Sequence, residues 1–412
     1  MRNQAEKTRK GMRGFGKGLQ KAIMRWYSEM EPKKLALQVC KYQSRRVEGE
    51  TPWSHRDLLR LTHIKANDEL HNLVYKYVAK GREAFSDTEW AALKETDLKY
   101  IWAHEEAKHL SKEKDLVKLI KDFRLTHESI PSEMKDSKAV YDVLVDHMPV
   151  TATLRNLGTM TKVGTIKVLG EKTKIVCDRL TDVEELKRGR VHPVSVLAAL
   201  KTYAQGHGFK GTNTWSPVQS VNDALNDAFY ASFNAIEPTG KRFLLGVDVS
   251  GSMGSSITAL PLMSCAEGSA VMAMAIARVE KNSHIMGFSH TFIDLKISAK
   301  DTLQNAMKKV RDSNFGGTDC ALPMVWAQQN KIDVDCFVVI TDSETWAGRG
   351  HPFEALKSYR KSSGIHNAKM VVIGMTSSGF TIADPSDSGM LDVVGFDTNT
   401  PNIISEFVRG TL

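Results

Sequence analysis

The sequence lacks the features that mark secreted and membrane-spanning proteins. No apolar run approaches the roughly 18 residues that a membrane-spanning helix needs, and the first residues carry no apolar signal-peptide core. The 5 cysteines are scattered, and no two of them form a Cys-x-x-Cys pair. They therefore indicate neither a disulfide framework nor a zinc site. These absences favour a reduced setting in the cytoplasm, with the nucleus as an additional compartment, and argue against membrane association and extracellular adhesion.

Most of the chain also lacks an excess of charge of one sign. Residues 61–239 carry 25 basic and 25 acidic side chains, and residues 240–412 carry 16 and 17. The whole basic excess lies in residues 1–60, where 15 Lys and Arg stand against 6 Asp and Glu. Such asymmetry predicts a polyanionic partner, most commonly nucleic acid. Arg13 and Lys17 belong to this stretch, and we expect both to contact RNA.

The glycines around Lys17 do not form a phosphate-binding loop. No strand precedes them, and Gly16-Lys17-Gly18 is not followed by the Ser or Thr that would hold the metal of a nucleotide. We expect instead a basic loop that leads into a helix over residues 19–30. The apolar side chains of this helix, including Trp26 and Tyr27, are expected to be exposed.

Residues 33–235 are dominated by apolar side chains at helical spacing, and short polar connections separate these stretches. The pattern is typical of an α-solenoid built from stacked helix pairs. The helices are expected over residues 33–42, 54–63, 69–80, 86–109, 114–121, 138–147, 150–160, 175–186 and 193–205, and Ser54 is expected to cap the second of them.

Beyond Pro238 the pattern changes to β-branched runs that alternate with helical stretches. This alternation predicts a doubly wound parallel sheet with helices on both faces, in which ligands bind at the carboxyl ends of the strands. We therefore divide the chain into a helical domain over residues 1–238 and an α/β domain over residues 239–412. Strands are expected over residues 242–249, 283–289, 336–341, 369–376 and 391–396, with helices over 263–280, 301–311, 319–329, 352–362 and 401–409.

Oxygen-bearing side chains follow two of these strands. Asp248 lies at the end of the first strand, with Ser250 and Ser252 just after it. Asp342 follows the third strand, and Thr318 lies between the two strands after two glycines. An all-oxygen set with few charges suits a hard cation that keeps some of its waters, as Mg²⁺ does. A serine-rich turn that binds no metal is the alternative.

The pattern Asp-x-Ser-x-Ser, followed by a distant Thr and a distant Asp, resembles the metal-ion-dependent adhesion site of von Willebrand factor A domains. The resemblance implies that Ser250, Ser252 and Thr318 contact the ion directly. It also implies that Asp248 and Asp342 hold the waters of the ion. One coordination position would then remain for an acidic group of a partner protein.

A helical repeat domain joined to an A domain resembles the TROVE architecture of the Ro/SS-A ribonucleoprotein autoantigen family. The resemblance covers nearly the whole chain and is carried by irregular stretches: RKGMRGFGKG at residues 9–18, DLLRL at 57–61, EPTGKRFLL at 237–245 and GFTIADP at 379–385. It implies HEAT-like repeats that close into a ring. The ring would hold small Y RNAs and the single-stranded 3′ ends of misfolded non-coding RNAs, in a role in RNA quality control.

The RNA-contacting residues of that family correspond here to Lys41, Arg45 and His63. Cations neutralise phosphates, and a histidine can stack on a base or donate a hydrogen bond to it. Two departures accompany the resemblance. Residues 47–52 look like an acidic insertion, and the chain is expected to lack the first helices of the family, so that its ring would stay open.

Three functions are compatible with these patterns. The first is a non-catalytic RNA-binding scaffold, which we favour. The second is a metal-dependent RNA hydrolase, which would need bridging acidic side chains that the metal motif does not supply. The third is a protein-binding adhesion module, which leaves the basic stretch of residues 1–60 unexplained.

Overall fold

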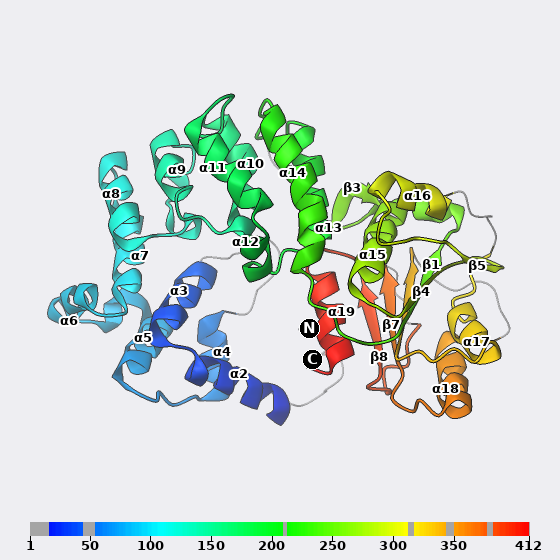
Figure 1. The fold of residues 1–412 in the computed structure, drawn as a ribbon. Helices are drawn as coiled ribbons and strands as arrows, with labels where there is room; N and C mark the ends of the chain where they lie inside the picture. The colour runs from blue at the N-terminus through cyan, green and yellow to red at the C-terminus, as the bar shows by residue number, and fades with distance from the viewer. Residues whose placement is uncertain are drawn as a thin grey trace. The chain divides into compact units, whose positions relative to one another are not determined.

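The chain forms two compact units in the computed structural model (Figure 1), which describes residues 16–43, 54–208, 212–311, 317–342, 350–376 and 382–411. Unit 1 comprises Met1–Met148 with Val163–Thr165, and unit 2 comprises Pro149–Lys162 with Ile166–Leu412. The boundary predicted at residue 238 falls inside unit 2 and stays a prediction. No helix within the described ranges is long and apolar enough to cross a bilayer.

Unit 1 is built from short helices whose apolar faces meet in a common core. Leu35, Val39 and Tyr77 are fully buried there. Ser54 caps α4 as predicted, since its side chain accepts a hydrogen bond from the Asp57 backbone N–H and the Asp57 carboxylate accepts one from the Ser54 backbone N–H. The helices are α2 (Lys17–Glu29), α3 (Pro32–Gln43), α4 (His55–Thr62), α5 (Glu69–Lys80), α6 (Asp87–Ala92), α7 (Lys99–His109), α8 (Glu113–Phe123) and α9 (Lys138–Leu144).

Three expectations for the helices were wrong. Residues 86–109 are not one helix, because the Thr96 hydroxyl donates to the Leu93 carbonyl and accepts from the Leu98 amide, which turns the chain between α6 and α7. The helix expected over residues 175–186 divides at Asp182, whose carboxylate caps a new helix. Tyr27 is fully buried rather than exposed, and its hydroxyl lies 2.5 Å from His55 Nδ1.

One group of helices in unit 2 precedes its sheet in the chain, and α13 of this group packs against both α15 (Cys265–Val279) and β3 (Leu260–Ser264). One helix, α14, was not among the predicted ranges. Its buried positions, among them Val221, Leu225 and Phe229, nevertheless recur at helical spacing. These helices are α10 (Val150–Lys162), α11 (Glu171–Thr181), α12 (Val183–Arg188), α13 (Pro193–Ala204) and α14 (Gln219–Ala231).

The predicted doubly wound sheet is confirmed. Its order is β5-β4-β1-β6-β7-β8, and every pair is parallel except β4 with β5. The antiparallel edge strand β5 and the hairpin of β2 (Ser256–Ile257) and β3 (Leu260–Ser264) were not predicted. The strands of the sheet are β1 (Phe243–Asp248), β4 (Ser283–Phe288), β5 (Phe292–Asp294), β6 (Cys336–Thr341), β7 (Lys369–Gly374) and β8 (Met390–Val394).

Helices cover both faces of this sheet. Leu244 and Phe337 belong to a buried core with Met324 of α17 and Leu356 of α18, and Figure 1 shows these two helices together on one side of the strands. Alternate residues of β1 point the other way, and α15 packs on β1 and β4. The helices are α15 (Cys265–Val279), α16 (Leu303–Arg311), α17 (Leu322–Gln329), α18 (Pro352–Ser363) and α19 (Thr400–Arg409).

A glycine in β1 allows α17 to approach the sheet closely. A Cβ atom at Gly246 would lie 2.6 Å from Pro323 Cγ, which is too close for any other residue. Pro323 stands in the first turn of α17. The close approach therefore brings the start of α17, and with it the preceding Thr318, toward the end of β1.

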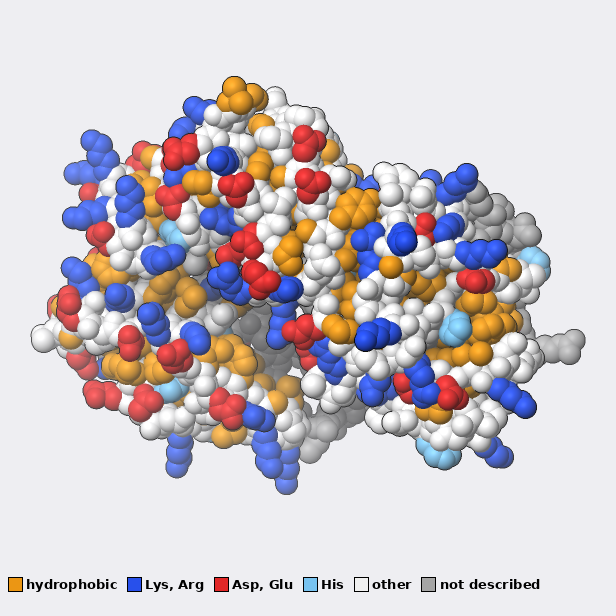
Figure 2. All heavy atoms as spheres, in the orientation of Figure 1, with side chains coloured by type: hydrophobic (Ala, Val, Ile, Leu, Met, Phe, Trp, Pro, Cys, Tyr) orange, Lys and Arg blue, Asp and Glu red, His pale blue; other side chains and the backbone are white. Residues whose placement is uncertain are grey.

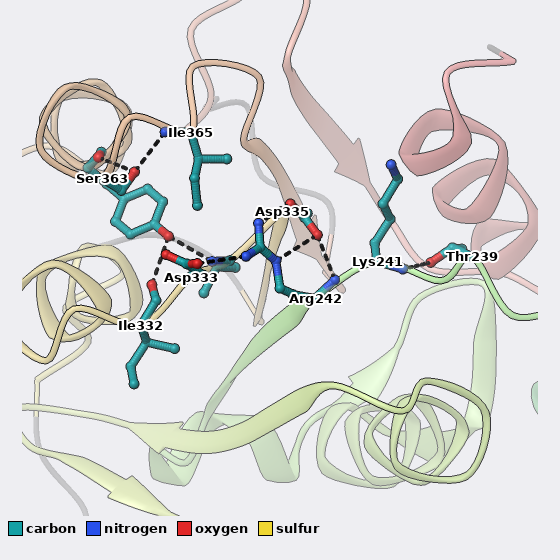
Figure 3. A network of polar contacts seen from close by, with 10 residues as sticks. Thr239, Lys241, Arg242, Ile332, Asp333, Asp335, Ser363 and Ile365 are labelled. Carbon is teal, nitrogen blue, oxygen red and sulfur yellow. Dashed lines mark hydrogen bonds and ion pairs between the residues drawn. The ribbon is translucent and has the colours of Figure 1, made fainter.

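The amino ends of β1 and β6 are joined by an arginine (Figure 3). The Arg242 side chain donates to both carboxylate oxygens of Asp335, at 3.0 and 2.7 Å, and to Asp333 at 2.8 Å. The Arg242 backbone N–H also donates to Asp335, at 2.9 Å. Two-pronged contacts of this kind fix orientation as well as charge, so they set the pairing of β1 with β6 at the end of the sheet opposite Asp248.

Replacing Arg242 with Leu is expected to destabilise unit 2 by about 1–2 kcal/mol at pH 7, the range for charge-assisted hydrogen bonds after allowance for solvent exposure. The side-chain hydrogen bonds from Arg242 lower the pKa of Asp335 below its ordinary value. This contribution is therefore present above the unfolded pKa and is lost as pH falls through the folded pKa. Urea unfolding of both proteins at pH 7 and pH 3 should show the difference shrinking in acid; a constant difference would contradict the assignment.

Candidate metal centre and nucleic-acid face

The five predicted metal residues gather at one edge of the sheet of unit 2. Asp248 ends β1 and Asp342 directly follows β6, and these two strands are parallel neighbours. The connection from β1 leads to β4 on one side, whereas β6 lies on the other side, so the strand order reverses between β1 and β6. Carboxyl ends at such a reversal are the usual ligand position in open α/β sheets.

Hydrogen bonds connect Ser250 and Thr318 to the Asp248 carboxylate, and Ser252 to Ser250. Asp248 Oδ1 accepts from the Ser250 backbone N–H at 2.9 Å, and Thr318 Oγ1 lies 3.5 Å from Oδ2. The hydroxyls of Ser250 and Ser252 lie 3.0 Å apart, so the turn directs both oxygens to one place. Asp342 is held through its backbone, where the carbonyl accepts from the Thr376 N–H at 3.1 Å.

Thr341 is a part of this cluster that the sequence analysis missed. Its hydroxyl donates to Asp248 Oδ2 at 2.8 Å, and the residue is fully buried. In the sequence it is simply the last residue of a β-branched strand, so its type gave no signal of a polar role. The hydrogen bond fixes the Asp248 carboxylate against the neighbouring strand.

The electrostatics of the cluster favour a cation. Asp248 is fully buried and Asp342 is 8% exposed. Burial raises the pKa of Asp248; the hydrogen bonds from Ser250 and Thr341 oppose the increase, and the negative charge of Asp342 adds to it. A buried carboxylate beside another negative charge gains from a positive ion placed between the two. The donor set therefore fits a hard divalent cation.

The cluster differs in composition from a site built on acids alone. Within the described ranges, no group of three or more His, Cys, Asp or Glu side chains is placed to hold a metal. Three of the five residues here are hydroxyl donors: Ser250, Ser252 and Thr318. Mg²⁺ commonly binds through one or two carboxylates and keeps several waters, so this count is compatible with the predicted site.

The predicted RNA residues lie on unit 1. Lys41, in the last turn of α3, is half-buried, and its Nζ lies 3.6 Å from Glu128 Oε1. The same ammonium lies 5.7 Å from the centre of the Tyr42 ring, which is exposed. Lys41 is thus near an aromatic surface that a base could use, but it already has an acidic partner.

Lys17 begins α2 and His63 directly follows α4, and these two helices contact each other. Lys17 is exposed at the start of α2, and Gln20, one turn further on, donates to the Thr62 carbonyl at 3.3 Å. His63 follows Thr62 with a positive φ of 50°, and its exposed imidazole makes no hydrogen bond to any residue in the described ranges. Arg13 and Arg45 lie outside the described residues.

A further basic surface on unit 1 was not predicted. Lys114, Lys118 and Lys121 are exposed on α8 at one-turn spacing, and none of them pairs with an acid among the residues that the structure describes. Figure 2 shows Lys and Arg side chains gathered over α8. The balanced charge of residues 61–239 concealed this row, because the neighbouring acids of α8 cancel it in a count.

Known proteins resemble the chain along nearly its whole length. Residues 2–202 match the TROVE domain family and residues 242–408 match the Ro60 vWA domain family. RNA-binding protein RO60 of Caenorhabditis elegans is 36% identical over 98% of this chain and 67% of its own length. RNA-binding protein RO60 of Deinococcus radiodurans is 39% identical over 96% of this chain and 72% of its own length.

A solved structure agrees with these sequence relatives. The crystal structure of the Deinococcus radiodurans RO (RSR) protein aligns with a TM-score of 0.75 and 38% identity, covering 97% of this chain and 78% of that chain. This chain therefore belongs to the RO60 family of RNA-binding proteins, which joins a TROVE domain to a vWA domain.

Proposed function

We propose that this chain is an RNA-binding protein that holds small structured non-coding RNAs of the Y RNA class and binds the 3′ ends of misfolded RNAs. The observation that carries the proposal is the charge excess of residues 1–60, which contain Lys17 and Lys41, with His63 shortly after them. We call these three residues the basic surface of unit 1. Cations of this kind neutralise phosphates and release counterions. Membership of the RO60 family supports the same ligand class.

The vWA domain has a different role in this proposal. Ser250, Ser252 and Thr318 would hold Mg²⁺, with Asp248 and Asp342 holding its waters. The ion would supply an open coordination position for a carboxylate of a partner protein. The buried Asp248 orients the Ser250 amide and the hydroxyls of Thr318 and Thr341, so the protein fixes the donor geometry before the ion arrives.

The site is proposed to be non-catalytic. Hydrolysis of RNA by two metal ions needs acidic side chains that bridge the ions, whereas three of the five donors here are neutral hydroxyls. A scaffold in cytoplasmic RNA quality control is consistent with this donor set. An adhesion-type module remains the alternative if the metal site acts without the basic surface.

Incubating the chain with a labelled hairpin RNA that carries a single-stranded 3′ tail, in the presence of Mg²⁺, separates these functions. We expect binding that weakens steeply with salt, because each neutralised phosphate releases counterions. The RNA should remain intact over hours in a denaturing gel. Cleavage that disappears in Asp248→Ala would instead establish a hydrolase, and the absence of any RNA binding would favour the adhesion-type module.

A further inference from the structure

The ammonium group of Lys41 is paired with a carboxylate of its own chain. Glu128 Oε1 lies 3.6 Å from Lys41 Nζ, and the side chains are 19% and 30% exposed, respectively. Both groups are therefore more shielded from water than an ordinary surface pair, in which competition from solvent leaves little net attraction. A phosphate that binds Lys41 therefore competes with this carboxylate for the ammonium group.

Glu128 lies in a turn that hydrogen bonds hold against α7. It lies in the 3-10 turn η3 (His127–Ser129), which packs against α3 and α7. Within this turn the Ser129 hydroxyl lies 2.9 Å from His104 Nδ1 and 3.1 Å from the Tyr100 hydroxyl, and the Thr126 N–H donates to Tyr100 at 3.2 Å. Because α7 fixes the turn, the backbone that carries the carboxylate is held beside α3, the helix of Lys41.

Neighbouring groups also favour the ionised form of Glu128. Its second oxygen, Oε2, lies 3.1 Å from His127 Nδ1. Burial opposes ionisation, but the nearby His127, a Thr126 hydrogen bond and Lys41 outweigh it and lower the pKa of Glu128. The side chain is therefore a carboxylate at neutral pH.

We propose that Glu128 is an internal competitor of RNA for Lys41, so that it sets the affinity of the basic surface of unit 1. This inference rests on the proposed RNA-binding function and assigns Glu128 a role within that site. An RNA phosphate must replace the carboxylate, and the displaced carboxylate then lies beside another negative group. The exchange weakens every contact made through Lys41, and it disfavours ligands that offer one phosphate and no further contacts.

The test measures RNA affinity for Glu128→Gln in the full chain, with a labelled hairpin RNA carrying a single-stranded 3′ tail. We expect binding to tighten roughly 2- to 10-fold at moderate salt, the size of effect expected for one partly shielded charge pair. In a Lys41→Ala background the same substitution should have no effect, since the competed group is gone. Glu133→Gln, which removes one exposed acid from the following turn, is the matched control for net charge and should change affinity less than about twofold.

Unchanged or weaker binding by Glu128→Gln would overturn the proposal, and weaker binding would mean that Glu128 orients Lys41 toward the RNA. If Glu128→Gln does not fold, Glu128→Asp keeps the charge but withdraws it by one methylene, and it should tighten binding by a smaller factor. No tightening there would equally overturn the proposal. The Lys41→Ala protein alone reports on the proposed function: if it binds RNA like the wild type, the assignment of Lys41 fails, whatever Glu128 does.

Discussion

Replacing Asp248 with Ala is expected to abolish Mg²⁺ binding by the vWA domain while RNA affinity stays nearly intact. The Asp248 carboxylate accepts hydrogen bonds from the Ser250 backbone N–H and the Thr341 hydroxyl, and Thr318 Oγ1 lies 3.5 Å from it. Its removal therefore takes away both a charge and the geometry of the hydroxyl donors. The basic residues lie on unit 1, so their phosphate contacts should not change. Calorimetric titration with Mg²⁺ and a filter-binding assay on the same protein measure the two activities.

Asp248→Asn is the control that separates metal loss from misfolding. Burial raises the pKa of Asp248. The folding stability therefore falls as pH rises from the unfolded pKa through the folded pKa, because the buried carboxyl must then ionise. The amide removes this cost at nearly the same shape. Without metal at pH 7, Asp248→Asn is therefore expected to unfold at or above the wild-type temperature and still fail to bind Mg²⁺. Equal loss of metal and RNA binding in a folded variant would contradict the separation of the two sites.

Changing Lys41 and Arg45 together to Ala is expected to weaken RNA binding by roughly 1–3 kcal/mol, the range for charge-assisted contacts. The salt dependence should also become shallower, because two fewer phosphates would be neutralised, each contributing about 0.9 to the slope on duplex RNA by analogy with B-DNA. Affinity measured at several salt concentrations gives both quantities. The expected loss is the net contribution of Lys41, because in the wild type an RNA phosphate must already displace Glu128 from it.

Lys33→Ala combined with Lys34→Ala provides a matched control for this pair. Both lysines are exposed on α3, the helix that carries Lys41, and their removal changes net charge by the same amount. They should cost little, since diffuse attraction is screened beyond a Debye length of about 10 Å at 0.1 M salt. An equal loss of affinity in both double variants would mean that the effect depends on net charge and not on the positions of Lys41 and Arg45. Unchanged affinity and unchanged slope in Lys41→Ala with Arg45→Ala would remove these residues from the site.

The sheet of unit 2 was predictable because its strands are buried on both faces. β1 and β6 are buried at every position, so they read as continuous apolar runs that end in Asp248 and in Thr341-Asp342. The short strand β5 and the β2–β3 hairpin were not predicted, because their few residues are half-exposed and their apolar side chains show no clear period. Strand order was not readable from the pattern, yet the carboxyl ends of β1 and β6 still identified the edge that carries the metal residues.

Polar contacts between distant segments could not be predicted from the sequence. The pairing of Lys41 with Glu128, and of Thr341 with Asp248, depends on which elements pack together, and neither residue type signals its partner. The break at Thr96 was missed for another reason. Its hydroxyl competes locally with the helix for backbone groups, whereas the apolar spacing continues across it.

The central claim is that RNA binds to the basic surface of unit 1 and not to the vWA domain. Photo-crosslinking the full chain to a hairpin RNA with a single-stranded 3′ tail, followed by mass spectrometry of the crosslinked peptides, tests this claim most directly. We expect crosslinks within residues 17–63, centred on Lys17, Lys41 and His63. Crosslinks confined to residues 243–411 would contradict it.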